Sequence, residues 1–345
     1  MNAEQWDLLL DVLDGKDTGR AVTGLIIDSP WLPGWYGIST LEYYASGEHW
    51  FGANMKAIQT FPQVIFLPGF WSEYGMCTEP SAFGAKLIWN EHSLPHAGRV
   101  IHDISQVQGM EKPDPRTQGL LPFVLQRLSE YQDRIRQEGH EILFAVARGP
   151  LNIASFLMGT SEFMMALIMN PEECHRLLGI ITEFTVDWLR LQKETFPSIE
   201  GILVLDDIVG FVDEQNCRDF AVPYLKEIFR AFDARVRFFH NDASGLVSTP
   251  YLGEMGVNLF NFSFEHSLTE IRELAGEEIT LLGNLPPRDV LAAGTPGEVR
   301  EAVTEMYYSI GSKRRIIWSV GGGMPQGVST GNLKVFLETI DEVSG

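Results

Sequence analysis

Residues 235–242 read RVRFFHND, a short apolar run that stops at a histidine, an amide and a carboxylate. Residues 201–207 read GILVLDD and have the same form, with branched side chains followed by two acids. Apolar runs of about 4 to 8 residues are typical of strands buried on both faces of a parallel sheet. These two segments therefore predict parallel strands whose carboxyl ends carry ionisable side chains.

Six further runs of this kind flank the two segments. They are 22–28 (VTGLIID), 63–67 (QVIFL), 141–147 (EILFAVA), 257–262 (VNLFNF), 279–283 (ITLLG) and 315–320 (RIIWSV). Helical patterns separate the runs, at 41–58, 120–137, 161–168, 171–196, 213–232, 268–275, 297–309 and 332–342. Strands that alternate with helices in this way predict an α/β protein, a single (β/α)8 TIM barrel domain over 1–345. An amphipathic helix is expected at the N-terminus.

One segment, 75–118, does not fit the plain repeat between the second and third strands. Its runs 86–89 (KLIW) and 100–104 (VIHDI) lie on either side of Pro95. This pattern predicts an inserted hairpin flap at the barrel mouth. A lid over the site and a purely structural flap are both compatible with it.

The charge of the chain limits its partners. Lys and Arg number 26 against 46 Asp and Glu, a net charge of −20. No run of Lys or Arg is expected to form a basic patch, so nucleic acid and anionic membranes are excluded as partners. A substrate with many carboxylates is disfavoured for the same reason.

The cysteines and the hydropathy pattern bear on the compartment. Cys77, Cys174 and Cys217 lie far apart and form no C-x-x-C pair, so neither a disulfide framework nor a cysteine-rich zinc module is expected. No apolar stretch reaches the roughly 18 to 20 residues that span a bilayer, and the N-terminus lacks the pattern of a secretory signal. A cytoplasmic protein is the resulting expectation.

In a barrel the chemistry belongs at the carboxyl ends of the strands. The strongest candidate is His240-Asn241-Asp242. Histidine exchanges a proton near neutral pH, Asn offers donors and an acceptor, and Asp accepts from N–H groups. The alternative is a solvated loop in which Asp242 caps the next helix.

Two other strand ends carry charge. Asp206 and Asp207 are adjacent, so they point to opposite sides and only one of them is expected to face the site. The alternative is a helix cap for the helix near Asp213. Arg148 is a lone cation that suits one carboxylate of a ligand, or a structural salt bridge to an acid such as Asp206.

The remaining strand ends supply single polar residues. Asp28, Ser263 and Asn284 are candidates for substrate binding, and Asn284 could equally cap a turn. The glycines 321–323 allow close backbone approach, but no phosphate-binding motif accompanies them.

Residues 283–285 (GNL), Leu291 and 294–299 (GTPGEV) form a set of motifs near the end of the chain. They resemble the G-N-[LV]-D-P…L…G-[TS]-P-E-E-V stretch of the uroporphyrinogen decarboxylase superfamily, with Pro286 in place of the usual Asp. Further similar segments are 148–151, 206–210 with 220–224, and 319–325. The resemblance extends from about residue 20 to nearly the end of the chain and independently implies the (β/α)8 barrel.

The resemblance also separates two branches of that superfamily. Its decarboxylases open with an arginine-rich R-Q-A-G-R-Y segment, whereas residues 27–33 here read IDSPWLP. Its corrinoid-dependent methyltransferases bind zinc through a His-x-Cys after the fifth strand and a Cys in the last loop. This chain keeps the histidine, His240, but has Asp242 and Gly322 at the cysteine positions.

Loss of the thiol-activating ligands favours a nitrogen acceptor. The resemblance then implies a methyltransferase that moves a methyl group between a methylcorrinoid (cobalamin) protein and N5 of tetrahydrofolate, with methyltetrahydrofolate as the methylated form and without metal. This is similar to the methylcorrinoid:tetrahydrofolate methyltransferases of glycine betaine demethylation. The catalytic candidates are His240, Asp207 and Asp242, and the substrate-binding candidates are Asp28, Arg148, Asp206, Asn241, Ser263 and Asn284.

Three alternatives remain open. The chain could be a decarboxylase of a smaller acid, or a zinc-dependent corrinoid:thiol methyltransferase. It could also be a barrel without catalytic activity that binds a corrinoid or a pterin.

Overall fold

A computed structural model describes residues 1–345 and contains eight parallel barrel strands. They are β1 (Gly24–Ile26), β2 (Ile65–Leu67), β5 (Phe144–Arg148), β6 (Gly201–Leu205), β7 (Val236–Asn241), β8 (Leu259–Phe262), β9 (Thr280–Leu285) and β10 (Ile316–Val320). β5 to β10 form one sheet in chain order, and β1 pairs with β2. A bridge between Thr23 and Trp318 joins the two sheets. The predicted barrel is thereby confirmed, with a seam between β2 and β5 where no strand ladder forms.

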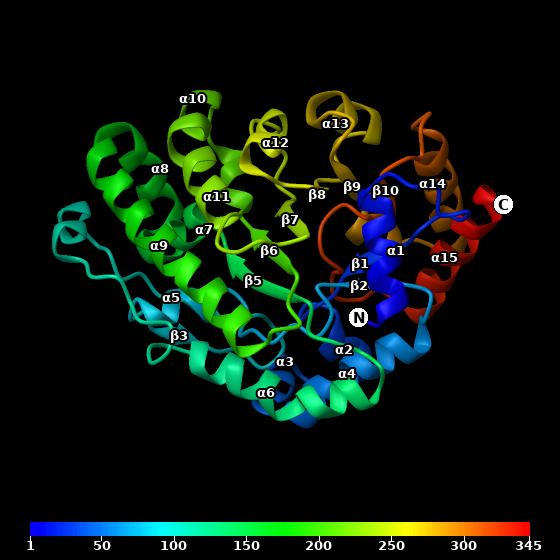
Figure 1. Ribbon diagram of the computed structural model, residues 1–345, viewed down its shortest axis with the longest axis horizontal. Coiled ribbons are helices and arrows are strands. Elements are labelled where there is room, and N and C mark those ends of the chain that lie inside the picture. Colours follow the sequence, from blue (N-terminus) through cyan, green and yellow to red (C-terminus); the bar gives the residue numbers. More distant parts are fainter.

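The helices surround these strands (Figure 1). They are α1 (Ala3–Leu13), α2 (Leu32–Tyr36), α3 (Thr40–Ala45), α4 (Gly47–Thr60), α5 (Thr78–Ala82), α6 (Leu121–Gln137), α7 (Pro150–Met158), α8 (Thr160–Met169), α9 (Pro171–Thr195), α10 (Glu214–Asn216), α11 (Val222–Ile228), α12 (Leu252–Met255), α13 (Leu268–Ala275), α14 (Pro296–Tyr308) and α15 (Thr330–Ser344). The helix expected over 213–232 is divided into α10, a π-helical turn over Cys217–Ala221 and α11. No pattern in the sequence predicted α7.

Two hydrophobic cores follow from the alternation of side chains along the strands. Leu203, Leu205 and Phe238 belong to a cluster of 20 buried residues inside the barrel. Their chain neighbours Ile202 and Val204 belong to a cluster of 83 residues between the strands and the helices. Since successive side chains point to opposite faces of a strand, every second residue at a strand end also faces the barrel interior.

The expected N-terminal helix is present as α1, and it closes one end of the barrel. A capping box between Asn2 and Gln5 begins the helix. Trp6 of α1 contacts Phe144 at the start of β5, with ring centroids 5.7 Å apart. Both residues belong to the interior cluster. Because the strands are parallel, this base is the end opposite the functional strand ends.

The insert at 75–118 contains a hairpin, although not the predicted one. β3 (Leu87–Ile88) pairs antiparallel with β4 (His96–Ala97), whereas residues 100–104 form no strand. The short hairpin leaves 100–104 outside because Val100 and Ile101 donate their backbone N–H groups to the carbonyl of Leu157 at the end of α7. The expectation of a second strand there was wrong.

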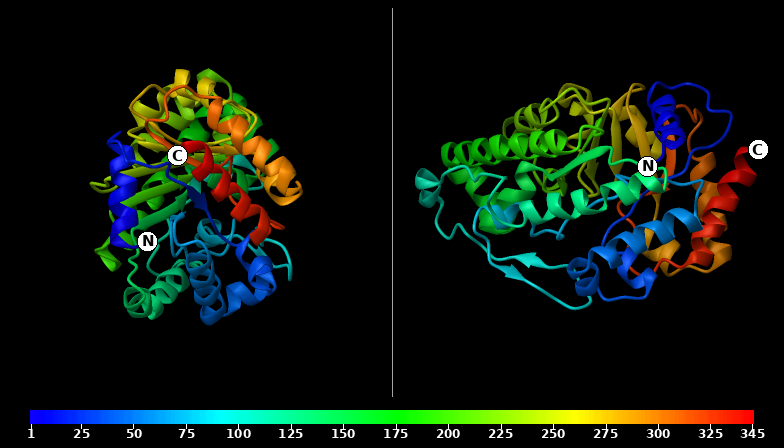
Figure 2. Two further views of the ribbon diagram at one scale, coloured as in Figure 1. Left: turned by 90° about the vertical axis from the view of Figure 1, so that its right-hand side faces the viewer. Right: turned by 60° about the horizontal axis from the view of Figure 1, so that its bottom comes forward.

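The two halves of the insert pack on different parts of the molecule. Trp89, after β3, contacts Tyr44 of α3 and Tyr74 in the segment after β2. The later half runs along α9, where Lys112 pairs with Asp187 at 2.5 Å. Figure 2 shows this segment, in cyan, along the edge of the molecule.

No single helix combines the length and the hydropathy needed to cross a bilayer. α7 and α8 meet that test only as a pair, and the pair is bent by 108°.

Candidate active site

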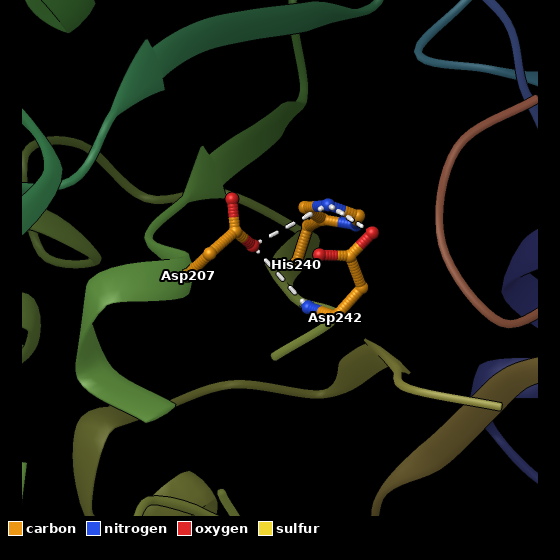
Figure 3. Close-up of side chains that lie close together, drawn as sticks. All are labelled: Asp207, His240 and Asp242. Carbon is orange, nitrogen blue, oxygen red and sulfur yellow. Dashed lines mark hydrogen bonds and ion pairs between the residues drawn. The ribbon is translucent and has the colours of Figure 1, made fainter. Parts of the chain in front are cut away.

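The inward-facing residues at the carboxyl ends of β6 and β7 form a cluster of one imidazole and two carboxylates. Two residues beyond the interior side chains Leu205 and Phe238 come Asp207 and His240, and Asp242 follows at the same spacing. Figure 3 shows the three side chains converging. The cluster unites the three residues that the sequence predicted to be catalytic.

Asn261 fixes the orientation of the His240 ring. It lies opposite His240 in the register of β7 and β8. Its amide nitrogen donates to the carbonyls of Leu282 and Val320, at 2.7 and 3.1 Å. The Asn261 Oδ1 is therefore the acceptor for His240 Nδ1, 2.8 Å away. This pairing assigns the proton of the neutral imidazole to Nδ1 and leaves a lone pair on Nε2.

The free nitrogen of His240 faces both carboxylates. Nε2 lies 3.6 Å from Asp207 Oδ1 and 3.9 Å from Asp242 Oδ2. The backbone N–H of Asp242 donates to the same Asp207 oxygen at 3.2 Å, which ties the ends of β6 and β7 together. Burial raises the pKa of Asp242, against the lowering effect of His240. The lone pair on His240 Nε2 lies beside the two carboxylates, in a position to accept a proton from a bound molecule.

The same three groups could hold a divalent cation. One ligand atom from each of Asp207, His240 and Asp242 lies within 4.8 Å of the others. An imidazole whose second nitrogen is fixed by a hydrogen bond is a common metal ligand. A Cβ built on Gly322 would lie 2.6 Å from Asp242 Oδ2, so position 322 borders the cluster and supplies no side chain to it. The donor set is nitrogen and oxygen, with no thiolate.

The three cysteines lie elsewhere and stay protonated. Cys77, Cys174 and Cys217 are buried. Burial raises the pKa of Cys77 to about 11 and that of the other two to about 12. None of them can supply a thiolate near neutral pH.

Asp206 points away from the cluster. Its carboxylate is fully buried and accepts from the backbone N–H groups of Leu151 and Asn152 at 2.9 and 2.8 Å. It thus caps the first turn of α7, which has no cap of its own. Both oxygens are occupied, so the structure gives Asp206 a structural role in place of the predicted contact with substrate.

Asn241 lies off the barrel interior, whereas Ser263 has the inward parity that Leu259 sets on β8. Both side chains form hydrogen bonds within loops. Asn241 Oδ1 accepts from Ala243 N–H at 3.2 Å, and its amide nitrogen donates to Ser248 at 3.4 Å. Ser263 is buried, and its hydroxyl accepts from Glu265 N–H at 3.3 Å. These two predicted ligand-binding residues order the loops after β7 and β8.

Asn284 occupies an inward position on β9, which Leu282 defines. Its amide nitrogen donates to the carbonyl of His266. The side chain is 9% exposed, so it borders the site while it supports the loop after β8. The hydrogen bond accounts for the structural role expected of Asn284, and substrate binding by its side chain stays a prediction.

Arg148 belongs to a buried ionic cluster that the sequence did not reveal. It donates to Glu73 at 2.8 Å, and its backbone N–H donates to Glu79 at 3.0 Å. The expected salt bridge therefore exists, but its partner is Glu73 and not Asp206. Glu73 and Glu79 come from the segment after β2, and their side chains are buried.

Carboxylates outnumber the guanidinium in this cluster. Burial raises the pKa of Glu73 to about 7, against the effect of Arg148. Burial also raises the pKa of Asp28 well above its ordinary value, and Glu73 adds to that rise. Glu73 and the inward-facing Asp28 are thus carboxyl groups able to retain protons near neutral pH.

The sequence of this chain is similar to those of known proteins. The family model described as uroporphyrinogen decarboxylase (URO-D) matches residues 36–343. The uroporphyrinogen decarboxylase of Chloroherpeton thalassium is 27% identical over 278 residues, which cover 77% of this chain and 76% of the relative. That of Aeromonas salmonicida is 22% identical over 280 residues, with the same coverage.

A solved structure supports the fold over almost the whole chain. A methyltransferase from Methanosarcina mazei superposes with a TM-score of 0.81 at 17% sequence identity, covering 97% of each chain. At that identity the likeness concerns the barrel architecture.

Proposed function

The chain belongs to the uroporphyrinogen decarboxylase family, and we propose that within this family it is a methyltransferase. It would exchange a methyl group between a methylcorrinoid carried by a partner protein and N5 of tetrahydrofolate. The observation that carries the proposal is the Asp207, His240 and Asp242 cluster, whose donor set contains no thiolate. A thiol acceptor at neutral pH needs activation that a soft, cysteine-bound zinc would supply. A secondary amine such as N5 needs only orientation and removal of a proton.

The residues divide the work of this reaction between them. The methylcorrinoid supplies an electrophilic methyl group, and the N5 lone pair forms the new N–C bond while the Co–C electron pair stays with cobalt. One proton then leaves N5. His240 Nε2, with Asp207 at 3.6 Å to stabilise the imidazolium, is the acceptor for that proton. In the reverse direction the same group returns it.

The flat pterin ring would lie in the mouth between the polar strand ends. Asp28 faces the barrel interior, and its raised pKa lets it donate or accept toward a heterocycle. Asn284 borders the same space. The outward-facing Asp206 and Asn241 act indirectly, through α7 and the loop after β7, and Ser263 supports the loop after β8.

The direct test is spectroscopic. The protein is mixed with methylcob(III)alamin and either tetrahydrofolate or the thiol 2-mercaptoethanesulfonate, and the corrinoid absorbance is followed. We expect a change toward cob(I)alamin with tetrahydrofolate only. A change only with the thiol, together with stoichiometric zinc in the purified protein, would refute the proposal in favour of the zinc-dependent alternative.

The family relationship keeps one further function in view. A decarboxylase of a smaller acid would need a cation to bind the carboxylate of its substrate. Arg148 is 8% exposed and already pairs with Glu73, so the observed geometry favours methyl transfer. Release of CO2 from a candidate acid, without corrinoid chemistry, would reverse this preference.

A further inference from the structure

A cationic hollow lies at the base of the barrel, at the end opposite His240. It has a volume of about 590 Å3 and is bordered by the segment before β1 and the segment before β10. We name it the base pocket and define it by Lys16, Arg20, Lys313, Arg314 and Arg315. Its volume is in the range of small-molecule sites.

The charge of the base pocket is opposite to that of the chain. Five of the 26 Lys and Arg residues line it, against a single carboxylate, Asp17. The sequence-based expectation that no basic patch forms was therefore wrong. The run at 313–315 is short, and its partners Lys16 and Arg20 lie about three hundred residues away along the chain, so only the closed barrel brings the five side chains together.

Three of the five cations are held in place by the protein. Lys313 is half-buried and donates to the carbonyls of Tyr307 and Ile310, and its ammonium lies 4.6 Å from the centre of the Tyr307 ring. Arg315 donates to the carbonyl of Leu13 and pairs with Glu278 at 3.1 Å. Lys16 pairs with Asp11 at 2.7 Å.

Two guanidinium groups remain available. Arg314 uses only its Nε, which donates to the Gly15 carbonyl at 2.7 Å and leaves both terminal nitrogens without an intramolecular partner. Arg20 is exposed on the rim and forms no ion pair. Acids are abundant in this chain, yet neither group is neutralised by one. Arg315 follows Arg314 in the chain and directly precedes β10. It is the one non-glycine residue with a positive φ, 56°. This backbone conformation is costly, and the surrounding contacts hold it.

We propose that the base pocket binds a phosphate-bearing small molecule, with Arg20 and Arg314 gripping the phosphate. The planar fork of a guanidinium matches phosphate oxygens in a bidentate manner. Lys313 adds fixed positive charge from the wall of the pocket. The volume of the base pocket exceeds that of inorganic phosphate alone. The ligand class that fits is therefore a phosphate or diphosphate ester about as large as a nucleotide. This site is separate from the mouth and does not depend on the proposed reaction.

The test measures binding by isothermal titration calorimetry with inorganic diphosphate, adenosine diphosphate and tetra-aspartate as probes. We expect one saturable site for the two phosphate probes that weakens as salt is raised. The double variant Arg20→Ser/Arg314→Ser should bind at least about tenfold more weakly, since each lost bond involves a charged group. The control Lys86→Ser/Arg230→Ser removes the same charge from exposed positions elsewhere and should bind as the unaltered protein does.

Each other outcome overturns the proposal. Failure of both phosphate probes to saturate, preference for tetra-aspartate, or equal weakening in the control would each exclude a phosphate site here. Thermal unfolding of each variant shows whether it is folded. If the double variant is not folded, the single variant Arg20→Gln, at an exposed position on the rim, replaces it in the comparison with the control.

Discussion

The inward and outward faces of the same strand ends perform different tasks, and Asp206 and Asp207 show this most directly. Asp206 is fully buried between strand and helix and caps α7. Asp207, one residue later, turns into the barrel mouth and lies beside His240. The same type of side chain, an aspartate, thus stabilises the fold on one face of the strand and belongs to the candidate site on the other. At the end of β6, the parity of the residue along the strand decides which role it takes.

The largest effect is expected at the centre of the inward face. His240→Ala should lower the rate of methyl transfer by about 100-fold or more, because the proton acceptor is lost. The measurement is the corrinoid absorbance assay with tetrahydrofolate. His175→Ala, on the exposed surface of α9, is the matched control. Equal rates for His240→Ala and the control would show that the inward-facing residues at the strand ends do not take part in the reaction.

The next largest effect is a difference in protein stability between variants of the two aspartates. Asp206→Ala leaves two buried N–H groups of α7 without an acceptor and should lower the free energy of unfolding by about 2 to 4 kcal/mol. Asp207→Ala, at a half-exposed position, should cost less than about 1 kcal/mol. Urea denaturation measures both values. Similar losses for the two variants would contradict the division by parity.

A smaller effect is expected at Asn241. The sequence favours a contact with substrate, whereas the structure uses the side chain to order the loop after β7. Asn241→Ala should therefore reduce kcat by less than about tenfold, and leave the KM for tetrahydrofolate within about twofold, because no direct contact is removed. A large rise in KM with kcat unchanged would instead show that Asn241 binds substrate.

The last prediction on this comparison concerns the pH dependence of stability. Glu73 has an ordinary pKa of 4.5 and a pKa of about 7 in the folded protein. Between these values the unfolded chain has lost the proton while the folded protein retains it, so the stability associated with this group falls as the pH rises from about 4.5 to 7. Glu73→Gln should flatten the dependence in this window. An unchanged profile would show that Glu73 ionises normally.

The fold and the central cluster were accessible from the sequence because both depend on local patterns. Apolar runs that end in polar residues identified the strands, and His240 followed directly from such a run. Applying the alternation of β6 would have separated Asp207 from Asp206, since Leu203 and Leu205 share the parity of Asp207. Glu73 and Glu79 gave no such signal, because one lies in an irregular segment and the other in the short helix α5, and their contact with β5 exists only in the folded barrel.

The seam between β2 and β5 bears on the order in which the barrel assembles. The strands β5 to β10 pair with their neighbours in the chain, so they can form with little loss of loop entropy. β1 must instead reach β10, and the Thr23 to Trp318 bridge spans nearly the whole chain. We expect the β1–β2 pair to be the last part to join and the first to detach. In native-state hydrogen exchange, amides of β1 and β2 should open at a lower free energy than those of β6 to β8.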